Sequence, residues 1–232
     1  DNILTDMLPA FAPYYDEERL LTKVRNSIGE EHYIDVYHAL QEHAQEPIYY
    51  RTDHHWTSLG AYYGFLAWAD SVGRFPYPYD VNGRKTVSEN FQGTLQSRIN
   101  VDWTKDSIQY FPETEKKAIS VTYDFTDTAD SLYAPDYLDT KNQYGFFLND
   151  NHAFIEIHTE YNPGKTLFVI KDSYANSLIP LLTTHYENIY VVDLRYYNGK
   201  LFQLMEQYEP EQGMDVLVLY DCIHFLEDFN YY

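Results

Sequence analysis

The clearest hydrophobic pattern lies in the C-terminal third of the chain. Residues 166–170, Thr-Leu-Phe-Val-Ile, form a continuous apolar run, which is typical of a β-strand covered on both faces. A helical pattern follows at about 174–186, then a strand at 188–193, a helix near 201–208 and a strand at 215–219. Strands that alternate with helices over short links pair in parallel through right-handed crossovers. We therefore predict an α/β fold, a three-layer sandwich with a mostly parallel sheet.

The first third of the chain mixes helical and extended patterns. Acidic residues from Asp16 onward and an apolar stripe behind them predict a helix that ends at Gly29. The elements expected after it are a short strand around 33–37, a helix through 39–45, an extended run at 48–51, and a helix capped by Thr57 or Ser58 that stops at Gly73.

The middle of the chain, at about 74–162, has a different character. Prolines and glycines interrupt short β-prone runs such as residues 119–123, and no helical period is visible. We interpret this segment as an irregular, β-rich insertion. A length of 232 residues fits one domain with a substantial core, so the prediction is a single domain over residues 1–232.

Charge and composition exclude several classes of protein. The chain has 36 acidic and 16 basic side chains and a formal net charge of −20, so it would repel nucleic-acid phosphates. Disorder is disfavoured because aromatic residues make up 18% of the sequence. No apolar run reaches the ~18 residues that a membrane span needs, and no signal-peptide core is visible. The start at Asp1 without methionine indicates a fragment or a processed product.

Cysteine and tyrosine add two further constraints. The single cysteine, Cys222, rules out an intramolecular disulfide and a zinc site built from cysteines. The apolar residues 216–220 before it indicate a buried, inert thiol. The 25 tyrosines fit an exported surface that handles sugars, because their rings can stack on pyranose faces. Most of them are nevertheless expected in core and rim positions, since tyrosine is amphipathic.

The strongest candidate for chemistry is Ser173, in the run Lys-Asp-Ser-Tyr-Ala-Asn that directly follows the predicted buried strand. Ligands in open α/β sheets bind beyond the carboxyl ends of the strands. A serine at such a strand-to-helix turn exposes its hydroxyl, and its own N–H can stabilise an oxyanion. Serine is also a preferred helix cap. The local pattern favours nucleophile and cap about equally.

A second candidate is the run Asp53-His54-His55-Trp56, at the end of another extended segment. Side chains two residues apart in an extended chain point to the same face, so Asp53 and His55 can lie side by side. The carboxylate would then hold the Nδ1 proton and leave Nε2 as a base, which is half of a serine triad. The alternatives are a pair that only ties down a loop, and a metal site. Metal is disfavoured because no helical His-x-x-x-His pair accompanies the run.

A third, weaker element is Gly93, within Phe-Gln-Gly-Thr-Leu. Glycine lets the backbone approach a ligand closely, so its N–H is either a second oxyanion donor or part of a turn. The remaining histidines are scattered and are interpreted as surface or structural residues; they are His32, His38, His43, His152, His158, His185 and His224.

Together these motifs carry a resemblance. Residues 50–63, Tyr-Arg-Thr-Asp-His-His-Trp-Thr-Ser-Leu-Gly-Ala-Tyr-Tyr, resemble the signature of the bacterial DHHW family. That family is related to the SGNH-hydrolase-like O-acetyltransferases that modify exported polysaccharides such as alginate. Residues 93–95 and 171–176 resemble its other recurring blocks, in the same order. The resemblance extends from about Leu8 to the C-terminus.

The resemblance implies an SGNH/flavodoxin-like fold, with Ser173 as nucleophile, His55 as base and Asp53 as orienting acid. Two departures stand out. Ordinary SGNH hydrolases have the serine first and an Asp-x-x-His near the C-terminus, and Lys171 replaces the glycine that usually precedes Asp-Ser. The family context also implies a membrane anchor and a first strand upstream of Asp1. We expect this chain to lack both, and the full-length protein to be extracytoplasmic, at the cell surface and membrane-anchored.

The predicted function is that of an extracytoplasmic serine acyl-transfer enzyme, an O-acetyltransferase or acetylesterase that acts on a cell-surface or exported polysaccharide. Ser173 would form an acyl-enzyme, and its N–H would hold the oxyanion together with Gly93 or Asn176. No cofactor and no metal are expected. The acyl acceptor, sugar or water, stays open at this point. The family context implies a membrane-bound acyltransferase that supplies acetyl groups.

The rival hypothesis is a non-catalytic glycan-binding or surface-interaction module built on a degenerate SGNH fold. Its support is the tyrosine content, the lysine at position 171 and the expected lack of a first strand. One distance distinguishes the two hypotheses: in an enzyme the hydroxyl of Ser173 lies within hydrogen-bond reach of the imidazole of His55, and in a binding module it does not.

Overall fold

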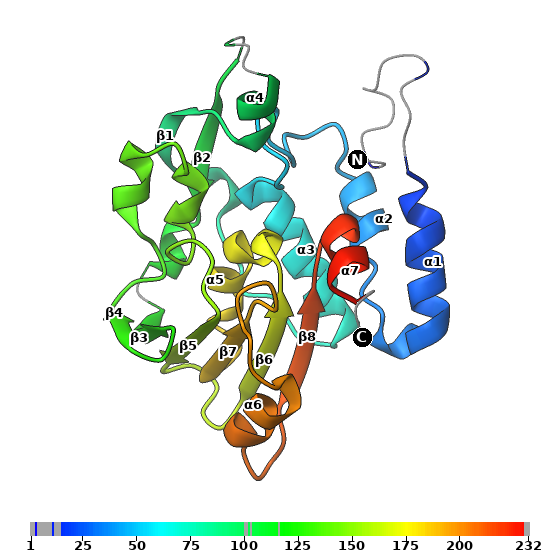
Figure 1. The fold of residues 1–232 in the computed structure, drawn as a ribbon, viewed down its shortest axis with the longest axis vertical. Coiled ribbons are helices and arrows are strands. Elements are labelled where there is room, and N and C mark those ends of the chain that lie inside the picture. Colours follow the sequence, from blue (N-terminus) through cyan, green and yellow to red (C-terminus); the bar gives the residue numbers. More distant parts are fainter. Residues whose placement is uncertain are drawn as a thin grey trace.

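A computed structural model describes residues 3, 11, 15–99, 102, 104–115 and 117–229. Within this part of the chain, the main feature is a six-stranded sheet with the strand order β4-β3-β5-β7-β6-β8 (Figure 1). Strands β1 and β2 form a separate antiparallel pair. The strands are β1 Lys85–Phe91, β2 Asp106–Tyr110, β3 Ala118–Tyr123, β4 Asp127–Ala129, β5 Phe154–Thr159, β6 Thr166–Lys171, β7 Asn188–Val192 and β8 Asp215–Leu219.

The prediction of a mostly parallel three-layer sandwich was wrong. Only β7, β6 and β8, which strand–helix–strand links connect, are parallel to one another. The pairings of β4 with β3, β3 with β5 and β5 with β7 are antiparallel. Strands β3, β4 and β5 come from the segment that was interpreted as an insertion. Because β3 and β4 form a hairpin and β5 enters beside β7 from the opposite direction, this half of the sheet is antiparallel.

Both faces of the parallel part are covered by apolar side chains. On β6, Leu167 and Val169 belong to the large core, which also holds residues of α3 and α5. Phe168 and Ile170 point to the other face, where Leu204 of α6 packs against them. All six residues of β6 are buried. This agrees with the continuous apolar run in its sequence and makes β6 the most enclosed strand that the structure describes.

The helices follow the predicted pattern in part; the helix expected at about 174–186 is replaced by the 3-10 helix η7, Ser173–Ser177, and the four-residue helix α5. Thr57 caps α3 through its Oγ1, which accepts a hydrogen bond from the N–H of Gly60 at 3.3 Å. Gly60 is needed there because a Cβ would clash with the carbonyl of Ile48. The strand expected around 33–37 is absent from the described residues, and Val36 instead begins α2. The helices are α1 Glu17–Ile28, α2 Val36–Gln41, α3 Ser58–Ser71, α4 Thr94–Ile99, α5 Ile179–Leu182, α6 Leu201–Tyr208 and α7 Cys222–Phe229.

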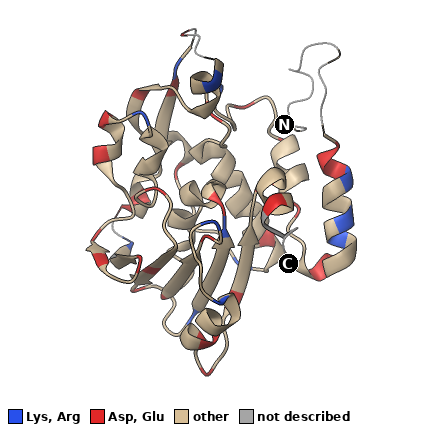
Figure 2. Ribbon diagram, viewed as in Figure 1, with Lys and Arg blue, Asp and Glu red and all other residues tan. Residues whose placement is uncertain are grey.

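Cys222, expected to be buried, begins α7 and is only partly buried. Burial still raises the pKa of its thiol, to about 12. Asp and Glu are spread over most of the elements, whereas Lys and Arg are few (Figure 2). Among the helices that the structure describes, none has both the length and the apolar character of a membrane span.

Candidate active site at the carboxyl end of β6

Ser173 lies directly beyond the carboxyl end of β6, at the start of the 3-10 helix η7, Ser173–Ser177. Asp172 separates it from the strand and accepts a hydrogen bond from the N–H of Tyr174 through Oδ1, at 2.8 Å. This side-chain cap forces the chain to turn sharply immediately after the strand. Ser173 is buried, with 6% of its surface exposed. The cap is therefore Asp172, and the hydroxyl of Ser173 is available for another partner.

That partner is His55. Its Nε2 lies 2.8 Å from Oγ of Ser173, and its Nδ1 lies 2.5 Å from Oδ1 of Asp53. The structure thus brings together the three side chains that were predicted to converge, although Ser173 is far from His55 in the sequence. Their chemical roles remain predictions at this point. His55 and Asp53 are both buried.

The local reason for the Asp53–His55 pair differs from the prediction. Residues 51–55 form an irregular bend rather than an extended segment. The bend is closed by backbone hydrogen bonds from Tyr50 N–H to the carbonyl of His55 at 3.2 Å and from Thr57 N–H to that of Ile48 at 2.9 Å. Asp53 Oδ1 also accepts from the backbone N–H of His55 at 3.0 Å. The aspartate therefore binds both the backbone and the ring of the histidine.

Thr94 and Gly93 complete the surroundings of Asp53. Oδ2 of Asp53 accepts from the backbone N–H of Thr94 at 2.8 Å and from its hydroxyl at 3.1 Å. A Cβ at Gly93 would clash with this carboxylate, so only glycine fits there. Burial raises the pKa of Asp53, but the hydrogen bonds with His55 and Thr94 outweigh it and hold this pKa well below its usual range. Asp53 is consequently ionised at neutral pH.

Lys171 and Asn176 lie behind the turn that carries Ser173. The Lys171 ammonium is fully buried and donates to Asn151 Oδ1 and Asp193 Oδ2, both at 3.0 Å. Burial lowers its pKa, and Asp193 opposes that effect. Nδ2 of Asn176 donates to the carbonyl of Asp150 and to Asn151 Oδ1, both at 3.3 Å. Asn151 therefore connects the lysine of the strand to the turn.

The two other candidate oxyanion donors already have partners. Gly93 N–H donates to Oγ1 of Thr52 at 3.3 Å, and the Asn176 amide is engaged as described above. Their role at an oxyanion remains a prediction.

Several neighbours of the site were not found by sequence reasoning. Tyr144 stacks on the ring of His55 with centroids 3.8 Å apart and planes at 9°, and its hydroxyl donates to the carbonyl of Ser173 at 3.2 Å. Asp106 Oδ2 accepts from both N–H and hydroxyl of Thr52, at 2.7 and 2.6 Å. No local sequence pattern identifies Tyr144 or Asp106, because the segments that carry them come next to the site only when the chain folds.

A second group of ionisable residues follows β8 at the same edge. Asp221 and His224 join Asp172: His224 Nδ1 lies 2.5 Å from Asp221 Oδ2 and 3.3 Å from Asp172 Oδ2. The N–H of Asp221 also donates to Asp172 at 2.8 Å. Sequence reasoning placed His224 among the scattered histidines. Its position just after a predicted parallel strand was the signal that could have identified it.

Two triplets have ligand atoms close enough to hold a metal ion. They are Asp53, His54 and His55, and Asp172, Asp221 and His224, each with its atoms within 4.8 Å of one another. In the described structure, however, Nδ1 of His55 and Nδ1 of His224 are both engaged with carboxylates. A metal ion would have to compete with these hydrogen bonds.

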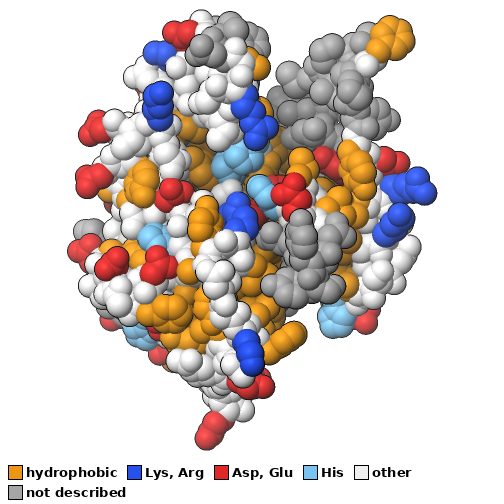
Figure 3. All heavy atoms as spheres, viewed as in Figure 1, with side chains coloured by type: hydrophobic (Ala, Val, Ile, Leu, Met, Phe, Trp, Pro, Cys, Tyr) orange, Lys and Arg blue, Asp and Glu red, His pale blue; other side chains and the backbone are white. Residues whose placement is uncertain are grey.

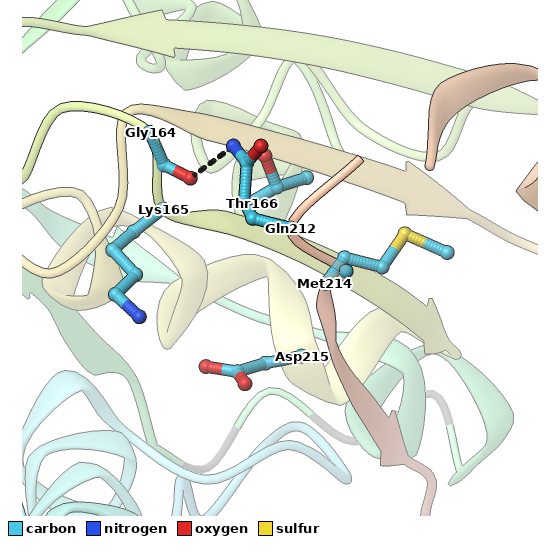
Figure 4. Close-up of a pocket in the computed structure, with 7 residues that line it drawn as sticks. Gly164, Lys165, Thr166, Gln212, Met214 and Asp215 are labelled. Carbon is cyan, nitrogen blue, oxygen red and sulfur yellow. Dashed lines mark hydrogen bonds between the residues drawn. The ribbon is translucent and has the colours of Figure 1, made fainter. Parts of the chain in front are cut away.

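Figure 3 shows histidine side chains near the middle of this face, beside a basic and an acidic side chain. A separate hollow of about 200 Å³ lies at the opposite end of β6 and β8, between Thr166 and Asp215 (Figure 4). There Gln212 Nε2 donates to the carbonyl of Gly164 at 2.9 Å. Because it is at the amino end of the strands, this hollow is not part of the Ser173 site.

Comparisons with known proteins agree with this architecture. Bacillus cereus PatB1, solved with a sulfonyl adduct, matches with a TM-score of 0.72 and 22% identity over 95% of this chain and 76% of its own. A second PatB1 structure matches with a TM-score of 0.68 and 20% identity, over 95% of this chain and 78% of its own. At these identities the likeness shows the fold alone.

A DHHW family protein from Eubacterium siraeum matches with a TM-score of 0.66 and 27% identity over 81% of this chain. The match spans 63% of that protein. No curated protein matches the sequence. The family model described as "DHHW protein" matches residues 19–192, well over half of the sequence. That segment contains all three residues of the Asp53–His55–Ser173 arrangement, and the chain belongs to the DHHW family.

Proposed function

We propose that this protein is a serine acyl-transfer enzyme, an O-acetyltransferase or acetylesterase with Ser173 as nucleophile. One observation carries the proposal: His55 Nε2 lies 2.8 Å from Oγ of Ser173 while its Nδ1 lies 2.5 Å from the carboxylate of Asp53. A base that touches the nucleophile and is itself oriented by a third group is the arrangement that activates a hydroxyl.

The proposed reaction has two steps. In the first, Oγ of Ser173 bonds to the acyl carbon of the donor while its proton passes to Nε2 of His55. The leaving oxygen of the donor takes that proton as its bond to the acyl carbon breaks, which leaves an ester on Ser173. In the second, an acceptor hydroxyl loses its proton to His55 and bonds to the acyl carbon. The bond from that carbon to Oγ of Ser173 breaks, and Oγ takes the proton back from His55. Asp53, ionised because its pKa is low, stabilises the imidazolium that forms in each step.

Charge also develops on the acyl oxygen and requires hydrogen-bond donors. The N–H of Ser173, at the sharp turn after β6, is the proposed principal donor. Gly93 N–H and the Asn176 amide donate to other groups, so either one must exchange a hydrogen bond before it can contribute.

The relatives support an acyl-transfer reaction. PatB1 forms a sulfonyl adduct, and sulfonyl reagents attach to nucleophilic side chains. The family resemblance points further, to a relationship with SGNH-like enzymes that acetylate exported polysaccharides. We accordingly propose a polysaccharide or acetylated glycan as substrate, a membrane-bound acyltransferase as acetyl donor, and an extracytoplasmic location at the cell surface.

A sulfonyl fluoride and an activated acetyl ester test the proposal. The sulfonyl fluoride should add one sulfonyl group to the wild-type chain, at Ser173 by mass spectrometry of the peptides. The Ser173→Ala variant should remain unlabelled and release acetate from the ester at close to the uncatalysed rate. The fold should survive, because Asp172 and not Ser173 caps the turn.

Ser177→Ala is the matched control, since Ser177 is a buried serine of the same turn. It should still be labelled at Ser173. If the wild-type chain is neither labelled nor active on the ester, the acyl-transfer proposal is wrong, and the glycan-binding hypothesis replaces it.

A further inference from the structure

Two neighbouring histidine rings pack against each other beside Ser173, and only His55 is hydrogen-bonded to it. The rings of His54 and His55 have centroids 3.9 Å apart and planes tilted by 37°. His55 is buried, whereas 35% of the His54 side chain is exposed. His54 is therefore the more exposed of the two rings beside the proposed base.

The hydrogen bonds of Thr94 determine which nitrogen of His54 carries the proton. The hydroxyl of Thr94 has one proton, and Oδ2 of the ionised Asp53 lies 3.1 Å away. This carboxylate is a stronger acceptor than a neutral imidazole, so the hydroxyl donates to it. The same hydroxyl also lies 2.6 Å from Nδ1 of His54, so in that contact the hydroxyl accepts and the imidazole donates. Nδ1 of His54 is thus protonated, and Nε2 keeps its lone pair.

His54 and His55 consequently share one tautomer. Nδ1 of His55 faces Oδ1 of Asp53 at 2.5 Å, and Nδ1 of His54 lies 3.8 Å from the same oxygen. The two Nδ1 atoms are thus turned toward Asp53, and the two Nε2 atoms lie on the sides of the rings away from it. Nε2 of His55 meets Ser173. Nε2 of His54 has no hydrogen-bond partner among the described residues.

The position of His54 is held firmly. The hydroxyl of Tyr174, one residue after the proposed nucleophile, donates to the backbone carbonyl of His54. Burial, followed by the neighbouring His55, lowers the pKa of His54 to about 4. The ring is therefore neutral at neutral pH, and Nε2 can accept a hydrogen bond.

We propose that Nε2 of His54 accepts a hydrogen bond from a second hydroxyl of the acyl acceptor, next to the hydroxyl that reacts. This inference rests on the proposed function and names its acceptor class: a compound with two adjacent hydroxyls, as on a sugar ring. In the second step His55 takes the proton of the reacting hydroxyl, which forms the new ester. His54 takes no proton and changes no bond. It holds the neighbouring hydroxyl and so favours such an acceptor over a single hydroxyl or water.

A competition experiment tests this. The protein is acylated by an activated acetyl ester in the presence of two acceptors, a methyl glycoside with two adjacent free hydroxyls and a matched glycoside in which one of them is methylated. The ratio of the two acetylated products is measured. Because both acceptors react with the same acyl-enzyme, this ratio does not depend on the rate of acylation.

The wild-type chain should prefer the diol. His54→Phe keeps a ring against His55 but removes the nitrogen acceptor, and it should lower the product ratio about fivefold, as expected for one hydrogen bond between neutral groups. His54→Gln retains an acceptor oxygen and should lower the ratio less. His32→Ala, which removes an exposed histidine far from the site in the sequence, should leave the ratio unchanged.

An unchanged ratio in His54→Phe, or no preference for the diol in the wild-type chain, overturns the inference while acylation of Ser173 still supports the proposed function. If His54→Phe does not fold, His54→Leu, which also lacks the nitrogen acceptor, takes its place, and an unchanged ratio in that variant contradicts the proposal. If wild-type Ser173 is not acylated at all, the proposed function and this inference are both wrong.

Discussion

Two clusters of aspartate and histidine flank Ser173, and they hold their histidines in different ways. In the first, one carboxylate, Asp53, lies 2.5 Å from Nδ1 of His55 and binds Thr94 with its other oxygen. In the second, two carboxylates meet at one ring, since Nδ1 of His224 lies 2.5 Å from Asp221 and 3.3 Å from Asp172. The first cluster leaves the far nitrogen of its histidine next to a hydroxyl. The second connects two segments of the chain.

The charge states follow from this difference. The hydrogen bond with Asp172, and the charge of Asp221 with it, raise the pKa of His224 to about 9, so this ring is a cation at neutral pH. Burial and the charge of Asp172 raise the pKa of Asp221 in turn. The pKa of His54 is shifted in the opposite direction, because burial lowers it to about 4. The same residue types thus give a neutral histidine, His54, on one side of Ser173 and an ion cluster on the other.

The largest expected effect separates the clusters by activity. Asp53→Asn presents an amide to Nδ1 of His55 and favours the wrong tautomer, so kcat for ester cleavage should fall about 10⁴-fold. Asp221→Asn, which alters only the second cluster, should cause a much smaller loss. Steady-state kinetics on an activated acetyl ester measure both. Comparable losses in the two variants would contradict the division of roles.

The next effect separates them by stability. Asp172 binds the N–H groups of Tyr174 and Asp221 and the cationic ring of His224, so Asp172→Asn weakens charge-assisted hydrogen bonds in a buried position. The free energy of unfolding should fall by about 2 kcal/mol. Urea denaturation measures this loss.

Asp53→Asn is the comparison variant for this measurement. The free energy of unfolding should fall less in this variant. The substitution weakens the hydrogen bonds from the backbone N–H and hydroxyl of Thr94, but it also removes a buried negative charge, and the second effect offsets part of the first. A larger loss for Asp53→Asn would show that the first cluster also holds the fold together.

The smallest effect depends on pH. His224 has a folded pKa near 9 against an ordinary value of 6.5, so its stabilisation is fully present below about pH 6.5 and is lost as the pH rises through 9. Because 27% of its side chain is exposed and solvent screens the charges, the loss should be about 1 kcal/mol. Unfolding of the wild type and of His224→Gln between pH 6 and pH 10 checks this. If the free energy of unfolding changes with pH in the same way in both proteins, the ionisation of His224 does not contribute to stability and the prediction is wrong.

The sequence predicted the elements on which the site rests. The continuous apolar run of β6 and the capping of α3 by Thr57 agree with the structure. Both signals are local: burial on two faces requires apolar residues in succession, and a cap requires a hydroxyl at one position. The spacing of Asp53 and His55 was equally local, although a bend and not an extended segment brings them together.

Strand direction in the rest of the sheet was not predictable in this way. Strand β5 pairs antiparallel with both β3 and β7, yet its alternating burial is compatible with parallel or antiparallel partners. The partner of a strand is chosen by contacts between segments that are distant in the sequence. Pattern reasoning on the C-terminal third therefore described β6, β7 and β8 and extended their parallel pairing wrongly to the whole sheet.

What the sequence by itself determined is which groups the site contains: a serine after a buried strand and an aspartate two residues before a histidine. Only the tertiary structure decided that Tyr144 stacks on His55, that Asp106 binds Thr52, and that the hydroxyl of Thr94 lies against Nδ1 of His54. These are long-range contacts, and no local pattern of residues encodes them. Their geometry exists only when the strands and bends that carry them are packed into one core.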